Sequence, residues 1–103
     1  MLPPIVAAKL EEVAVLCRRH HVRRLDLFGS ATSARFDPAT SDLDFVVQFG
    51  PMPMGSHANA YFGLKEDLEA LFERSVDLVS AEKIINPYFA QTVDASRVRL
   101  YAA

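Results

Sequence analysis

The sequence reads Ser41-Asp42-Leu43-Asp44-Phe45-Val46-Val47-Gln48-Phe49 near its centre, and this stretch decides the predicted fold. Polar and apolar residues alternate at its start, and an apolar run follows, which is typical of a strand that becomes buried. Two shorter runs of the same kind lie on either side of it, at residues 24–28 and 76–79. We therefore expect a central strand over residues 41–49 and two shorter strands at those positions.

Helical patterns separate these strands. Apolar residues recur at helical spacing along residues 4–20 and again along residues 57–74. Asn86-Pro87 is suited to the cap and first position of a further helix that would end near Ser96, and the tail over residues 98–101 could be extended. Because helices and strands alternate, we expect the α/β class, with helices packed on a sheet of three or four strands.

Composition limits the classes of protein to which the chain can belong. It has 103 residues, of which 50% are hydrophobic and 23% are charged, so we expect one globular domain over residues 1–103. The net charge of −2 offers no basic surplus for direct binding of nucleic acid. With one cysteine and no recognisable leader, the expected location is cytoplasmic. Residues 45–64 lack charged side chains, but their glycines and prolines argue against a membrane helix.

Three carboxylates form the candidate metal site. Asp42 and Asp44 are two residues apart on the predicted strand, so they would share a face and could bind one hard cation. Asp77 lies on another apolar strand, where a buried charge is costly unless a cation neutralises it. Neither strand contains Lys or Arg, so a bound metal ion is the simplest explanation for these carboxylates. The alternative is that Asp42 caps a turn and Asp44 is exposed at a sheet edge.

Gly29-Ser30 ends the strand that precedes this site. Backbone N–H groups at a turn into a short helix can receive a phosphate, and the Ser30 hydroxyl would add a donor or simply cap that helix. A triphosphate held there would bring its oxygens to metals bound by the carboxylates. Together these parts suit nucleotidyl transfer.

The chain resembles the minimal nucleotidyltransferases of the DNA polymerase beta superfamily. The resemblance is carried by Leu27-Phe28-Gly29-Ser30, by Asp42-Leu43-Asp44-Phe45-Val46-Val47 and by Val76-Asp77-Leu78-Val79. The tail, from Asn86-Pro87-Tyr88-Phe89 to Leu100-Tyr101-Ala102-Ala103, resembles the end of short members that act as antitoxins.

This resemblance implies a small nucleotidyltransferase fold with a mixed sheet. It also implies that Gly29 and Ser30 contact the nucleotide phosphates, that Asp42 and Asp44 bind Mg²⁺, and that Asp77 completes a catalytic site for two such ions. ATP would be the substrate. The partner would be a HEPN-domain toxin, a ribonuclease, held in a hetero-oligomer and silenced by transfer of AMP to one of its tyrosines.

One segment departs from the family pattern. Members usually continue from Gly-Ser to an Arg-Gly pair, where this chain has Ser33-Ala34 and its nearest arginine is Arg35. Arg35 is therefore the candidate phosphate-binding cation or a surface charge. The departure favours an alternative in which a catalytically weak antitoxin neutralises its toxin by binding alone. Transfer to a small molecule such as an aminoglycoside is a third reading, although 103 residues leave little room for a separate acceptor domain.

Overall fold

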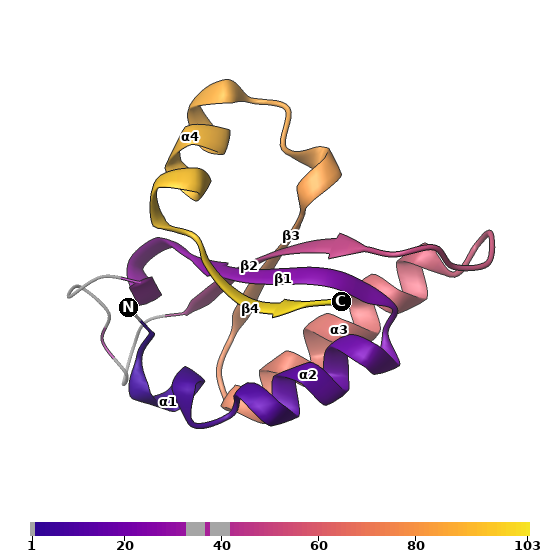
Figure 1. The fold of residues 1–103 in the computed structure, drawn as a ribbon, viewed down its shortest axis with the longest axis horizontal. Coiled ribbons are helices and arrows are strands. Elements are labelled where there is room, and N and C mark those ends of the chain that lie inside the picture. The colour runs from indigo at the N-terminus through magenta and orange to yellow at the C-terminus, as the bar shows by residue number, and fades with distance from the viewer. Residues whose placement is uncertain (1, 33–36, 38–41) are drawn as a thin grey trace.

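The computed structural model describes residues 2–32, 37 and 42–103, and its centre is a four-stranded mixed sheet (Figure 1). The strands lie in the order β3-β2-β1-β4. Their bounds are Val22–Phe28 for β1, Leu43–Phe49 for β2, Val76–Ser80 for β3 and Val98–Ala102 for β4. β1 runs antiparallel to both β2 and β4, whereas β2 and β3 are parallel. The predicted α/β class and mixed sheet are confirmed, and the tail is the fourth strand.

The N-terminal segment contains two helices, so the prediction of one helix over residues 4–20 is wrong. α1 spans Pro4–Ala7 and α2 spans Leu10–Arg19, and the two run in different directions (Figure 1). The first helix ends because the Lys9 N–H donates to Val6 O, a tighter turn than the α-helical one, and Lys9 itself has non-helical dihedrals. Both helices still bury apolar residues in the core, among them Val6 and Val13.

The larger core lies between the sheet and helices α1, α2 and α3, and α3 spans His57–Phe72 (Figure 1). α3 ends two residues earlier than predicted because Glu73 adopts a left-handed conformation at φ 53°. Two α3 side chains also reach the outer side of β3. The Tyr61 hydroxyl donates to Leu78 O, and a Glu69 carboxylate oxygen accepts from the Val76 N–H at 3.1 Å.

α4, which spans Pro87–Ser96, packs on the opposite face of the sheet, where it contacts β1 (Figure 1). Asn86 caps it as predicted, since its Oδ1 accepts from the N–H groups of Tyr88 and Phe89. A smaller apolar cluster of Phe28, Val46 and Val93 joins α4 to the sheet. The described part of the chain also contains two short 3₁₀ helices, η1 over Gly29–Thr32 and η2 over Ala81–Lys83.

No helix among the described residues is long and apolar enough to cross a membrane.

Candidate active site

Asp44 lies at the meeting point of three strands. In the parallel pairing of β2 with β3 it stands opposite Asp77, and in the antiparallel pairing of β1 with β2 it stands opposite Phe28, the last residue of β1. Gly29 follows directly. The two segments that the sequence singled out, Gly29-Ser30 and the aspartates, therefore converge at one end of the sheet.

The carboxylates face the side of the sheet on which α4 packs. Leu43 and Phe45 belong to the larger core, so Asp44 between them points to the other face, as strand alternation requires. The same reasoning applies to Asp77, which lies between the core residues Val76 and Leu78. Asp44 and Asp77 are thus neighbours on one face of adjacent strands.

Electrostatics links all three carboxylates. Burial raises the pKa of Asp44, and the negative charges of Asp77 and Asp42 raise it further. Asp44 is half-buried, whereas Asp42 and Asp77 are exposed. The arrangement concentrates negative charge around one partly desolvated carboxylate.

Two expectations about these residues are corrected. The sequence predicts a buried charge at Asp77, but Asp77 is exposed because β3 is the edge strand farthest from β1, where α4 packs. Asp42 was expected to lie on the strand, but β2 begins one residue later, at Leu43. Asp44 is therefore the carboxylate for which burial matters.

The carboxylates have the chemistry of a hard-cation site but do not form a closed one. Among the described residues, no three His, Cys, Asp or Glu side chains are grouped closely enough to hold a metal ion. The donor set nevertheless consists of carboxylate oxygens, the ligands that Mg²⁺ favours, and a cation beside Asp44 would offset the repulsion that raises its pKa. The residues present therefore fit a divalent ion by their chemistry and charge.

Gly29 begins the turn beside Asp44, with a φ of +77° that favours glycine. A Cβ at this position would lie 2.6 Å from Asp44 Oδ2, so the backbone can approach that carboxylate only without a side chain. The Gly29 N–H donates to Ser96 Oγ at 3.0 Å, and Gly29 O accepts from the Thr32 hydroxyl at 2.9 Å. Ser30 is exposed at the next position. Arg35 and the Ser33-Ala34 pair lie outside the described residues.

A buried aspartate bound by two arginines on the same face was not predicted from the sequence. Asp26 is fully buried on β1, and its carboxylate accepts from Arg24 Nη2 at 2.9 Å and from Arg97 Nε at 2.6 Å. Burial acts to raise the pKa of Asp26, but the hydrogen bonds from the two arginines outweigh it and hold that pKa below its usual value. The available signal was the acidic residue between two leucines of a strand, which requires a cation if it is buried.

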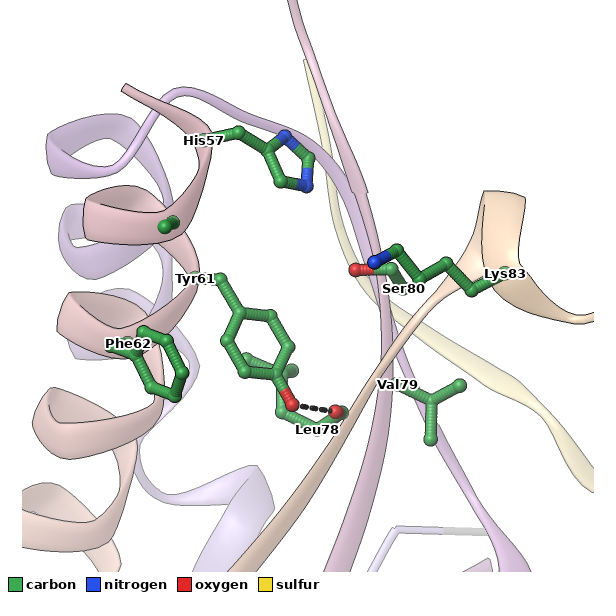
Figure 2. A pocket seen from close by; sticks show the side chains of 8 residues that line it. His57, Tyr61, Phe62, Leu78, Val79, Ser80 and Lys83 are labelled. Atoms are coloured by element: carbon green, nitrogen blue, oxygen red, sulfur yellow. Dashed lines mark hydrogen bonds between the residues drawn. The ribbon is translucent and has the colours of Figure 1, made fainter. Parts of the chain in front are cut away.

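A cavity of about 580 Å³ lies apart from the carboxylates, between α3 and the β3–η2 segment (Figure 2). His57, Tyr61 and Phe62 line it from α3, while Ser80 and Lys83 line it from the other side (Figure 2). None of the three aspartates lines this cavity. The candidate site is therefore the open carboxylate cluster at the end of the sheet and not this cavity.

Comparison with known proteins agrees with this geometry. Residues 11–100 match the family model of the nucleotidyltransferase domain. No curated protein matches. A solved minimal nucleotidyltransferase is 34% identical, with a TM-score of 0.70 and 95% of each chain covered.

More distant solved structures share the fold. One is a complex of an MNT antitoxin with a tri-AMPylated HEPN toxin from Shewanella oneidensis, at 19% identity, a TM-score of 0.65, and coverage of 95% of this chain and 73% of that one. Another is a toxin–antitoxin structure with AMP-PNP, at 21% identity, a TM-score of 0.66, and coverage of 91% and 73%. With a family model matched over most of its length and a carboxylate cluster beside a Gly-Ser turn, this chain belongs to the nucleotidyltransferase domain family and resembles its minimal members.

Proposed function

We propose that this chain is an antitoxin that transfers AMP from ATP to a tyrosine hydroxyl of a HEPN-domain toxin in an Mg²⁺-dependent reaction. The observation that carries the proposal is the position of Asp44, which lies beside Asp77 and the Gly29 turn with a pKa raised by burial and by its acidic neighbours. Such a cluster suits a bound divalent ion and a nucleotide phosphate. The solved complex with a tri-AMPylated toxin supports AMP as the transferred group and a toxin as the acceptor.

In the proposed reaction each residue has a defined task. Asp42, Asp44 and Asp77 would hold two Mg²⁺ ions. When bound, Mg²⁺ would lower the pKa of the acceptor hydroxyl and neutralise the negative charge of the leaving pyrophosphate. Gly29-Ser30, assisted by Arg35, orients the triphosphate against the carboxylates. Asp77, exposed on the edge strand, is the candidate base that accepts the hydroxyl proton.

The proposed step forms one bond to phosphorus and breaks another. The acceptor oxygen forms a bond to the α-phosphorus of ATP, and the bond from that phosphorus to the bridging oxygen of pyrophosphate breaks. The proton of the acceptor hydroxyl goes to the carboxylate of Asp77. The products are the AMP-modified acceptor and pyrophosphate.

The test uses the co-encoded HEPN partner. The chain is incubated with this partner, ATP and Mg²⁺, and both proteins are then weighed by mass spectrometry. We expect the partner to gain one or more AMP units in the presence of the wild-type chain and of Glu66→Gln, a control at an exposed carboxylate of α3. A stable complex with unmodified masses would replace this proposal with the antitoxin that acts by binding alone, which the Ser33-Ala34 departure favours.

A further inference from the structure

We infer that Ser96 is a positioning residue that sets the place of the Gly29 turn relative to Asp44. Ser96 is the last residue of α4, and its Oγ accepts a hydrogen bond from the Gly29 N–H at 3.0 Å. The two residues are 67 positions apart in the sequence, so this bond joins the end of α4 to the end of β1. The consequence for nucleotide binding rests on the function proposed above.

The Ser96 hydroxyl is oriented by its own helix. Its oxygen lies 3.2 Å from Thr92 O and 3.5 Å from Val93 O, the two carbonyls of the preceding turn that can accept the hydroxyl proton. A hydroxyl has one proton and two lone pairs, so donation into the helix leaves a lone pair for the Gly29 N–H. Ser96 thus connects the backbone of α4 to the backbone of the turn through two directed hydrogen bonds.

The same end of α4 is fixed to β1 a second time. Arg97, which follows Ser96, binds the fully buried carboxylate of Asp26 at 2.6 Å. Asp26 lies three residues before Gly29, so consecutive residues of α4 and its cap hold both the strand and the turn that follows it. The carboxylate of Asp26 is inaccessible to water, so its bond to Arg97 is strong and fixes the position of the neighbouring Ser96 relative to β1.

Small movements of Gly29 matter because the turn is in close contact with Asp44. With a Cβ position only 2.6 Å from Asp44 Oδ2, the backbone of Gly29 lies directly against the central carboxylate. Ser96 therefore fixes one side of the site while β2 fixes the other. The Gly29 N–H is therefore already hydrogen-bonded within the protein, so Ser96 acts on the proposed phosphate site by holding the backbone of Gly29 in place.

The experiment compares Ser96→Ala with Ser96→Thr, which keeps the hydroxyl. Thr92→Ala is the matched control, because the Thr92 hydroxyl also donates to a carbonyl one turn earlier in α4, that of Tyr88 at 3.0 Å, and has no bond to Gly29. Hydrogen exchange of the Gly29 amide is followed by NMR. The dissociation constant for AMP-PNP with Mg²⁺ is measured by calorimetry at a temperature where thermal unfolding shows every variant to be folded.

We expect Ser96→Ala to speed exchange of the Gly29 amide and to raise the dissociation constant roughly three- to tenfold, the worth of one hydrogen bond. Ser96→Thr and Thr92→Ala should stay close to the wild type in both measurements. Unchanged exchange in Ser96→Ala would show that the hydroxyl does not hold Gly29. Faster exchange with unchanged or tighter binding would show that the position of Gly29 does not assist the nucleotide, and either result overturns the inference.

Failure of the proposed function has a different signature. If the wild-type chain itself binds no AMP-PNP, the assignment of a nucleotide site fails and the role of Ser96 in nucleotide binding fails with it. The exchange measurement then still shows whether Ser96 holds the turn.

Discussion

Asp44 carries a negative charge that its protein surroundings disfavour, because it is partly buried and has two acidic neighbours. A carboxyl whose pKa is higher in the folded than in the unfolded state gives up stability once the pH rises through that folded pKa. We therefore expect Asp44→Asn to be at least as stable as the wild type at pH 7, while it loses AMP transfer by on the order of a hundredfold or more.

Two measurements check this prediction: thermal unfolding with and without Mg²⁺, and the assay of toxin modification. Mg²⁺ should raise the melting temperature of the wild-type chain and leave that of Asp44→Asn unchanged. Glu66→Gln is again the control. Retention of full transfer by Asp44→Asn would remove Asp44 from the proposed metal site.

Gly29 and Gly55 offer a matched pair for a second prediction. Both have positive φ, +77° and +85°, but a Cβ at Gly55 would meet nothing within 4 Å, whereas one at Gly29 would meet Asp44. Alanine at either position should cost about 1–2 kcal/mol of unfolding free energy from the left-handed backbone. Only Gly29→Ala should also displace Asp44 and abolish transfer. Chemical denaturation and the transfer assay separate the two effects, and equal activity of both variants would contradict the close approach seen here.

The ion pairs of buried Asp26 with Arg24 and Arg97 join β1 to the end of α4. The folded-state pKa of Asp26 is lowered, so its contribution to stability is present above its unfolded pKa of about 3.9 and is lost as the pH falls from there towards the folded value. We expect Asp26→Asn to lower the free energy of unfolding by about 1.5–3 kcal/mol at pH 7.

Urea denaturation between pH 7 and pH 2 tests this assignment. The stability difference between Asp26→Asn and the wild type should shrink as the pH falls below about 4, because the carboxyl of the unfolded wild type then becomes protonated, and that of the folded wild type follows at a lower pH. A difference that stays constant with pH would mean that the charge of Asp26 is not what holds α4 to β1.

The elements themselves were largely predictable, because their signals are local. The Asn86 cap, the alternation around Asp44 and the helical spacing in α3 each depend on neighbouring residues, and the structure confirms them. What the sequence did not reveal depends on distant residues or on exposure. The contact of Ser96 with Gly29 spans 67 positions, and the exposure of Asp77 depends on β3 being at the edge of the sheet.

The two faces of the sheet have cores of unequal size. Among the residues that the structure describes, sixteen buried ones form the core between the sheet and helices α1, α2 and α3, against three in the cluster that joins α4 to the sheet. Regions with few buried apolar contacts open locally at lower free energy. We expect the amides of α4 to exchange hydrogen faster than those of β1 and β2, and to become protected when AMP-PNP binds near Gly29. Hydrogen exchange followed by mass spectrometry tests this, and equal protection of α4 and β1 in the free chain would contradict it.

The hydrogen bonds from α3 to the outer side of β3 have a consequence for self-association. An exposed edge strand is a template on which another chain can add a strand and begin an aggregate. Here the Val76 N–H is bound by Glu69 and the Leu78 carbonyl by Tyr61, so two groups that an incoming strand would need are already used. A helix that packs in the core therefore also shields the strand that carries Asp77, and an exposed carboxylate can remain at the sheet edge without leaving that edge free for fibril-like pairing.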